Sequence, residues 1–336
     1  MRTKRNAKHR RTARAGMYLT GAVLGTAALT VAYTDAMTSI VARRRSPLAS
    51  RLSGLCTGKK REPEQAEQVR LAAEQLLKQP TEEVSLINRE GLTLKAHWYH
   101  AENPRRLLIL VHGWHSVWNR DFGVSAPFYH ENDCELLLIE QRSHGASEGK
   151  LIAYGARERY DVLEWLAYAR TVCPTTLPVY LCGLSMGAAT VLLCAGEPVV
   201  ADTVTAIVAD CGYTVPEEVV SERMRTLLRG ATDATMAAVN LNCRLRGGFT
   251  LKCCSTREAL AKDTCVPVFF IHGDADELVP CSMTLENYLA CSAPKEILIV
   301  HGAGHATSFL VDPETYKARV LAFFAAWDGR LNAANG

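Results

Sequence analysis

The stretch GLSMG, from Gly183 to Gly187, decides how this sequence is interpreted. It follows an apolar run, residues 177–182, that is typical of a buried strand. A serine between two glycines directly after a strand indicates a sharp turn into a helix, because glycine lets the backbone segments approach closely. Ser185 is then either a nucleophile on that turn or a structural serine. The choice depends on whether its chemical partners exist elsewhere in the chain.

Working outward from this turn, apolar runs alternate with amphipathic stretches. The alternation predicts an α/β fold with a mostly parallel, doubly wound sheet covered by helices on both faces. The interval 215–264 interrupts it, is polar and partly helical, and is predicted to form a small lid. Strands are expected at 84–87, 92–99, 107–111, 136–139, 178–182, 206–209, 266–271 and 297–300, and helices at 62–78, 157–169, 188–195 and 316–327.

The partners of a nucleophilic serine follow in the order serine, acid, histidine that this architecture uses. Asp276 lies in FFIHGDADELVP, residues 269–280, and His305 ends VHGAGH, residues 300–305. A serine hydroxyl needs such a base, and the base needs an orienting acid. Backbone N–H groups of Trp114, after the run 107–111, and of Met186 are the predicted donors to an oxyanion.

Other residues compete for these roles. Asp274 and Asp210 are alternatives to Asp276. The alternatives to His305 are His301, His272 and His112, which directly precede glycines at strand ends and are more typical of loop anchors.

The sequence patterns that suggest pocket and loop residues are less specific than those for the serine, acid and base. Trp114, Met224 and Phe249 are candidates for an apolar substrate pocket, although the last two could equally be lid packing. Glu158 and Asp161 are interpreted as helix-face residues that cap loops near the site. Arg142 and His144 are expected to brace their own loop.

Together these motifs resemble serine hydrolases of the α/β-hydrolase superfamily, closest to the bacterial Bem46-like and serine-aminopeptidase-like branch. The resemblance extends from about Val84 to Trp327. It implies Ser185 as nucleophile, with the acid, base and oxyanion donors predicted above. The family commonly has Asp at the first and Gly at the fourth place of EQRSHG, where this chain has Glu140 and Ser143. That departure affects a structural turn and not the predicted serine, acid and base. The quoted motifs are LILVHGW (108–114), EQRSHGASEG (140–149), YGARERYDVLEW (154–165), GLSMGAA (183–189), GGF (247–249), FFIHGDADELVP and VHGAGH.

The N-terminal part differs in charge from the rest. Residues 1–60 carry 13 Lys and Arg and one acidic residue, and the remainder is net acidic, which argues against nucleic-acid binding. Residues 15–34 contain no charge and are long enough to cross a bilayer. We therefore predict a basic tail (1–14), a single-pass membrane anchor (15–34) with the main domain outside, a connector with a helix (35–80) and a hydrolase domain (81–330). A cleaved signal peptide or a merely apolar helix is the alternative.

The predicted activity is cleavage of carboxylic esters of a small-molecule acyl substrate through an acyl-enzyme. The alternatives are an aminopeptidase or amidase, a membrane-anchored lipase or thioesterase, and a tethered binding protein that keeps the fold. An aminopeptidase would use acidic lid residues to bind a free α-amine, and Glu217, Glu218, Glu222 and Asp233 are available. No cofactor is implied. Among the 12 cysteines, Cys243, Cys253 and Cys254 lack the paired spacing of a zinc site, so no metal is expected. Cys182, Cys194 and Cys211 lie in apolar runs and are expected to be buried thiols. The sequence does not indicate an oligomeric state.

Overall fold

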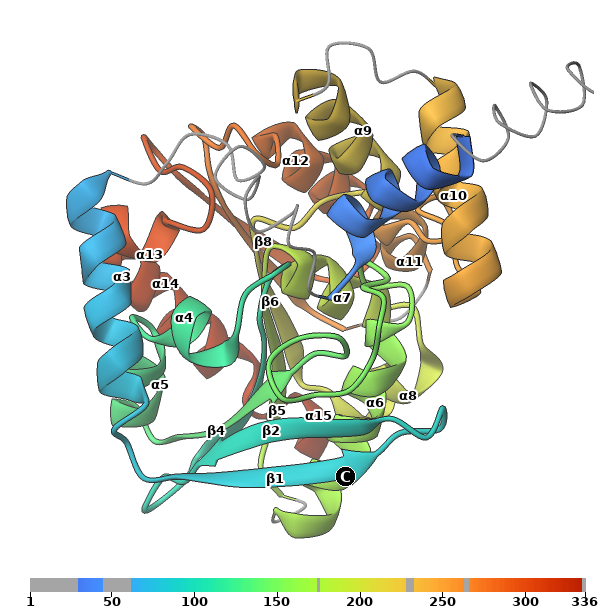
Figure 1. Cartoon of the computed structure of the whole chain (residues 1–336). Coiled ribbons are helices and arrows are strands. Elements are labelled where there is room, and N and C mark those ends of the chain that lie inside the picture. Colours follow the sequence, from blue (N-terminus) through green and yellow to red (C-terminus); the bar gives the residue numbers. More distant parts are fainter. Residues whose placement is uncertain (1–29, 45–61, 174–175, 228–232, 263–265, 334–336) are drawn as a thin grey trace, which may run out of the picture.

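The computed structural model describes residues 30–44, 62–173, 176–227, 233–262 and 266–333 (Figure 1). In these ranges eight strands form one sheet in the order β1-β2-β4-β3-β5-β6-β7-β8. Strand β2 is antiparallel to both neighbours, and the strands from β4 across to β8 are parallel. The predicted mostly parallel sheet is therefore confirmed. The strands are β1 (Thr81–Ile87), β2 (Thr93–Tyr99), β3 (Arg106–Val111), β4 (Cys134–Glu140), β5 (Val179–Leu184), β6 (Ala206–Asp210), β7 (Val268–Gly273) and β8 (Lys295–Val300).

The burial pattern of each strand agrees with its place in the sheet. Strands β3, β4, β6 and β7 are buried at every position, as expected where helices cover both faces of a parallel sheet. Strand β1 is at most half-buried along its length, which fits its position at the edge. The continuous apolar runs of the sequence thus mark the centre of the sheet.

Helices cover both faces of the sheet (Figure 1). On one face α3 (Pro63–Leu76), α4 (Trp118–Phe122), α5 (Ala126–Glu131), α13 (Ser308–Val311) and α14 (Pro313–Trp327) pack around an apolar core. On the other face the helices are α6 (Glu158–Val172), α7 (Met186–Cys194), α8 (Pro198–Thr203) and α12 (Cys281–Ala290). The short α15 (Arg330–Ala333) follows α14. Cys182, Cys194 and Cys211 are buried, as predicted.

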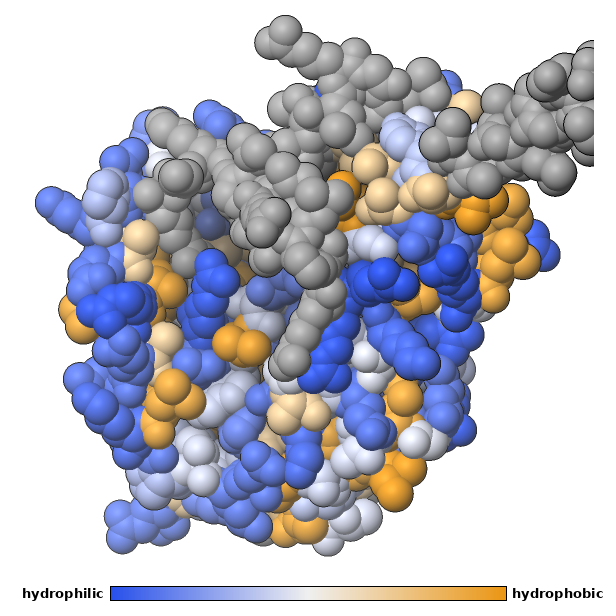
Figure 2. Space-filling model, viewed as in Figure 1, coloured by the Kyte–Doolittle hydropathy of each residue, from blue (hydrophilic) through white to orange (hydrophobic). Residues whose placement is uncertain are grey.

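The insertion between β6 and β7, which corresponds to the predicted lid, is helical. It consists of α9 (Pro216–Leu227), α10 (Asp233–Gly247) and α11 (Thr256–Leu260). A helix over residues 30–42 lies beside α10 (Figure 1). Apolar side chains also gather on the outer surface in this region (Figure 2), among them the exposed Leu241 and Leu245 of α10. The lid therefore exposes apolar side chains as well as burying them.

The N-terminal region requires a correction. Within the described ranges, every helix is either too short or too polar to span a lipid bilayer. That finding contradicts the predicted membrane-anchored, single-pass placement, and the described residues do not support the predicted membrane contact. Residues 15–29 of the predicted anchor lie outside the described residues. Residues 30–34 belong to a helix that continues to residue 42. Asp35, the first charged residue after the predicted span, lies within this helix and pairs with Arg246 at 2.5 Å.

Candidate active site

Ser185 lies on a strained turn between β5 and α7. Its backbone has φ 57° and ψ −117°, a conformation that L-residues rarely adopt. The flanking glycines are required sterically, because a Cβ on Gly183 would overlap the backbone of Gly187, and a Cβ on Gly187 would overlap the carbonyl of Val111. Backbone strain of this kind persists where the surrounding structure enforces it, and it is concentrated at functional sites. The turn projects Ser185 from the carboxyl edge of the sheet.

The sequence-predicted acid and base meet this serine. His305 Nε2 lies 2.8 Å from Ser185 Oγ, and His305 Nδ1 lies 2.7 Å from Asp276 Oδ2. The three side chains follow the carboxyl ends of β5, β7 and β8. Parallel strands bring such ends to one edge, which is why residues 120 positions apart are in contact.

Asp276 is held as an anion within this arrangement. Its Oδ1 accepts hydrogen bonds from the backbone N–H groups of Leu278 (2.8 Å) and Val279 (2.9 Å). Burial alone would raise the pKa of Asp276, but the charge of His305 and the hydrogen bonds from His272 and His305 outweigh it and hold that pKa well below its ordinary value. The carboxylate therefore keeps its charge while it orients His305.

His272 is a supporting residue that the sequence analysis considered as a rival base and as a loop anchor. It is completely buried, its Nε2 lies 3.1 Å from Asp276 Oδ2, and its Nδ1 lies 2.6 Å from Thr284 Oγ1. It thus contacts the acid instead of the serine. Its position at the end of a buried strand, four residues before Asp276, was the available signal.

The remaining competitors have other partners. Asp274 pairs with the exposed His301 at 2.7 Å. Asp210 accepts a hydrogen bond from Ser308 at 3.3 Å, and burial raises its pKa to about 6. His112 Nε2 accepts the backbone N–H of Gln141 at 3.1 Å. None of these side-chain contacts involves the hydroxyl of Ser185, although the backbone carbonyl of Asp210 accepts the backbone N–H of Ser185 at 2.9 Å.

The loop after β3 lies against the serine turn. A Cβ on Gly113 would be 3.3 Å from the Cβ of Ser185. Asp121 of α4, which the sequence reasoning missed, accepts the backbone N–H of Gly113 at 2.7 Å and the hydroxyl of Ser116 at 2.5 Å. Among the described residues, the backbone N–H groups of Trp114 and Met186 have no hydrogen-bond acceptor and stay available for a ligand oxygen.

The candidate pocket residues belong to one apolar cluster above the turn. Met224 and Phe249 are buried in it, Trp114 is half-buried against it, and Met186 contributes a fully buried side chain. The structure thus brings all of these predicted residues together. Their role in binding substrate stays a prediction.

Comparison with known proteins identifies the family. Residues 108–319 match the alpha/beta hydrolase family. This chain belongs to that family. A relative, the uncharacterized protein YqkD of Bacillus subtilis, is 29% identical over 188 residues, which are 56% of this chain and 61% of YqkD. The match therefore spans less than two thirds of that relative's length.

Solved structures support the same fold. The esterase Pf2001 of Pyrococcus furiosus superimposes on this hydrolase with a TM-score of 0.62 at 20% identity, covering 76% of this chain and 94% of the esterase. Est1E of Butyrivibrio proteoclasticus, solved with bound ferulic acid, gives a TM-score of 0.56 at 19% identity and covers 73% and 98%. At these identities the likeness establishes the fold of the hydrolase alone.

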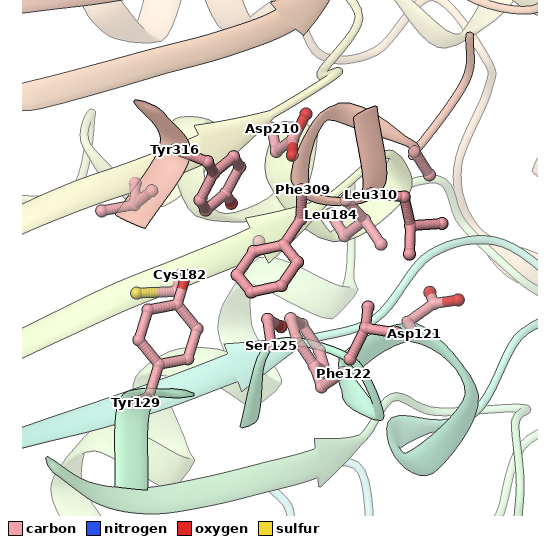
Figure 3. Close-up of a pocket in the computed structure, with 14 residues that line it drawn as sticks. Asp121, Phe122, Ser125, Tyr129, Cys182, Leu184, Asp210, Phe309, Leu310 and Tyr316 are labelled. Atoms are coloured by element: carbon pink, nitrogen blue, oxygen red, sulfur yellow. The ribbon is translucent and has the colours of Figure 1, made fainter. Parts of the chain in front are cut away.

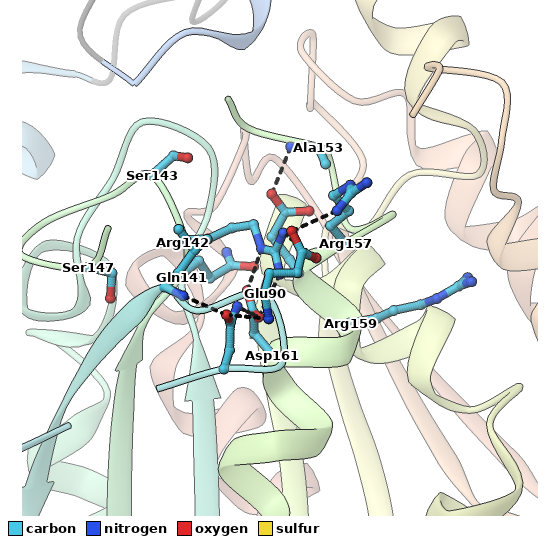
Figure 4. A network of polar contacts seen from close by, with 12 residues as sticks. Glu90, Gln141, Arg142, Ser143, Ser147, Ala153, Arg157, Arg159 and Asp161 are labelled. Atoms are coloured by element: carbon cyan, nitrogen blue, oxygen red, sulfur yellow. Dashed lines mark hydrogen bonds and ion pairs between the residues drawn. The ribbon is translucent and has the colours of Figure 1, made fainter. Parts of the chain in front are cut away.

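An ionic network holds the loop 141–157 of this hydrolase (Figure 4). The guanidinium of Arg142 contacts both carboxylate oxygens of Asp161, at 2.6 and 2.7 Å, and reaches Glu90 at 3.0 Å. Glu158, also buried, accepts the backbone N–H groups of Ala153 (2.7 Å) and Gly155 (2.9 Å). As predicted, Glu158 caps a loop and Arg142 braces its own, whereas Asp161 contacts the side chains of Arg142 and Asn88 instead of loop backbone. Ser143 has φ 65°, which explains why glycine is common at this place.

A small cavity of about 30 Å³ lies behind the serine turn (Figure 3). Leu184 and Ala306, which directly adjoin Ser185 and His305 in sequence, line it together with Asp121, Asp210 and Phe309. Its volume is room for roughly two water molecules, so it is too small for an acyl substrate.

One set of side chains has the types and spacing of metal ligands. Ligand atoms of Cys211, Asp276 and His305 lie within 4.8 Å of one another. Burial raises the pKa of the Cys211 thiol well above its ordinary value, and a protonated thiol is a poor ligand. Asp276 and His305 already bind each other, so this set fits a proton-transfer site better than a metal site.

Proposed function

We propose that this hydrolase cleaves carboxylic esters with Ser185 as nucleophile, His305 as base and Asp276 as orienting acid. The observation that carries the proposal is the unbroken contact chain from Ser185 Oγ to His305 and on to Asp276, at 2.8 and 2.7 Å. The strained backbone of Ser185 adds to it, since such a turn presents the hydroxyl to a substrate.

The reaction proceeds in two acyl-transfer steps. His305 Nε2 takes the proton of Ser185 as the serine oxygen attacks the ester carbonyl, and the carbonyl π electrons move onto its oxygen. When the tetrahedral intermediate collapses, the C–O bond to the alcohol breaks and His305 donates the proton to the departing oxygen. Water, deprotonated by the same histidine, then attacks the acyl-serine and releases the acid.

The oxyanion of each intermediate is stabilised by the backbone N–H groups of Trp114 and Met186. A single donor of this type contributes about 3–4 kcal/mol to the transition state. Met186 is the first residue of α7, so its N–H has no acceptor within the helix and also lies at the positive end of the helix dipole. The charge of Asp276 stabilises the imidazolium that forms on His305.

The apolar cluster beside Ser185 favours an apolar acyl group. Five of the seven methionines of the chain lie in or against it, from the 30–42 helix, α7, α9, α10 and α12. Methionine side chains are flexible and polarizable, so they adapt to apolar groups of different shape. These residues are Met37, Met186, Met224, Met236 and Met283.

The acidic residues of the lid argue against an aminopeptidase. Glu217 lies 3.2 Å from Lys252, and Glu218 lies 3.0 Å from Arg257. The other two acidic residues considered, Glu222 and Asp233, both lie within 4.0 Å of Arg225. A carboxylate that must bind a free α-amine would have to give up such a partner.

The test is turnover by the full chain. We expect hydrolysis of p-nitrophenyl esters of increasing acyl length, no cleavage of aminoacyl anilides, and stoichiometric labelling of Ser185 by a fluorophosphonate. Ser185→Ala should lose turnover and labelling, whereas Ser292→Ala, a serine that bonds to backbone carbonyls far from the site, should keep both.

Each other outcome has a defined meaning. Cleavage of anilides alone would replace the esterase proposal by the peptidase alternative. Full turnover by Ser185→Ala would refute the mechanism. The absence of both turnover and labelling in the wild type would favour the non-catalytic binding protein.

A further inference from the structure

Residues 35–44, which we call the N-terminal clamp, contact the loop that carries Trp114. The backbone carbonyl of Val41 accepts two hydrogen bonds, from the indole Nε1–H of Trp114 at 3.1 Å and from the hydroxyl of Tyr154 at 2.7 Å. Trp114 and Tyr154 also stack on each other, with ring centroids 6.3 Å apart. One peptide oxygen from outside the hydrolase domain therefore fixes the side chain of the residue whose N–H faces the proposed oxyanion.

The clamp is anchored by a second set of contacts. The guanidinium of Arg44 donates to the carbonyls of Ser147 (2.6 Å) and Gly145 (2.5 Å). The backbone of Ala42 accepts the N–H of Ile152 at 2.7 Å, and the backbone N–H of Arg44 donates to the carbonyl of Lys150 at 3.2 Å. The clamp thus pairs with the loop 145–152 along its main chain, and this pairing sets the position of the Val41 carbonyl.

The other end of the clamp reaches the lid. Met37 and Ile40 are buried in the same apolar cluster as Met224 of α9 and Met236 of α10. Asn242 of α10 donates to the hydroxyl oxygen of Thr38 at 3.0 Å. The clamp therefore connects the oxyanion loop with both long lid helices.

The oxyanion loop depends on such tethers because it has no regular secondary structure between Gly113 and Val117. His115 has φ 49°, so the turn after Trp114 is strained. Asp121 holds Gly113 and Ser116 from one side, and His144 Nε2 accepts the N–H of His115 at 3.0 Å. The Val41 carbonyl is the tether that acts on Trp114 itself.

We propose that the N-terminal clamp is a positioning element of the active site, which holds the Trp114 N–H in place for the oxyanion and fixes the lid over the apolar cluster. This inference rests on the proposed ester hydrolysis. Its consequence is that catalysis by the domain depends on residues about 70 positions before the oxyanion loop. A purely structural segment would affect the stability of the domain without a selective effect on kcat.

The experiment uses two variants of the full chain. Tyr154→Phe removes one donor to Val41, and Arg44→Ala removes the anchor to the loop 145–152. We expect kcat for a short p-nitrophenyl ester, and the rate of fluorophosphonate labelling, to fall about three- to tenfold in each variant, the range that the loss of one hydrogen bond allows, with KM unchanged.

The matched control is Tyr99→Phe. Tyr99 donates its hydroxyl to Gln79 at 3.1 Å and is buried like Tyr154, but it lies on β2, away from the site. Tyr99→Phe should lower the melting temperature about as much as Tyr154→Phe does, with wild-type kcat.

Two results would overturn the inference. One is wild-type kcat in both Tyr154→Phe and Arg44→Ala, and the other is an equal loss of kcat in the Tyr99→Phe control. Either result would leave ester hydrolysis itself standing. A wild type that neither turns over esters nor reacts with the fluorophosphonate would instead refute the proposed function.

Discussion

Asp210 carries a charge that destabilises the folded protein at neutral pH. The carboxyl is almost fully buried at the end of β6, and burial raises its pKa from 3.8 to about 6. The folded state therefore favours the protonated form. The contribution of this group to the stability of the folded protein is fully present below pH 3.8 and is lost as the pH rises through 6. The loss occurs because the unfolded chain releases the proton at a lower pH than the folded chain does.

The size of the effect follows from the two pKa values. A shift of about two units corresponds to about 3 kcal/mol of unfolding free energy at pH 7.5 and above. At pH 4 the same calculation leaves about 0.5 kcal/mol. Asp210→Asn cannot ionise, so its stability relative to the wild type should increase by about 2.5 kcal/mol between pH 4 and pH 7.5.

Urea unfolding of the full chain at pH 4, 5, 6 and 7.5 measures this difference. Val208→Ala, on the same strand and against the same cavity, is the control, since the methyl groups that it removes do not titrate. Its difference from the wild type should be independent of pH. If the difference between Asp210→Asn and the wild type is equally constant, the reasoning from burial is refuted.

Three further substitutions test the site. Asp276→Asn should lower kcat about 10⁴-fold, whereas Asp274→Asn, whose carboxylate pairs with an exposed histidine, should stay within about threefold in the same ester assay. Asp121→Asn should lower kcat about fivefold with unchanged KM, because it replaces a charge-assisted hydrogen bond to Gly113 with a neutral one. A fivefold rise in KM with unchanged kcat would indicate a role in substrate binding instead. Gly187→Ala should give no folded protein by circular dichroism, because its Cβ would overlap the Val111 carbonyl.

The sequence was sufficient for the sheet and for the contact between Ser185, Asp276 and His305. Each central strand contains an uninterrupted apolar run, which is a local signal. The candidate residues follow such runs directly, and parallel strands place their carboxyl ends side by side. Chain order and strand ends therefore predicted a contact across 120 residues without any knowledge of the intervening loops.

Asp121 and His272 could not be assigned in this way. Asp121 lies on α4, a five-residue helix too short to give a periodic pattern, and its role depends on how that helix packs beside Gly113. His272 lies in a strand where a histidine is compatible with many partners. Its contact with Asp276 becomes visible only when the turn 273–276 is built. Supporting residues of this kind depend on tertiary geometry rather than on local sequence.

The helix over residues 30–42 shows why hydropathy alone could not place the N-terminal region. An uncharged run predicts burial, but the same run is compatible with burial in lipid or against protein. Two features of the described residues 35–42, which follow that run, show packing against protein at this place. The side chains that follow Asp35, including Met37 and Ile40, enter an apolar cluster shared with the lid, and Asp35 itself has a partner in Arg246. Arg246 and several members of that cluster belong to the insertion 215–264. The position of residues 35–42 therefore depends on the lid that they contact, and a variant that weakens the lid should release the clamp as well.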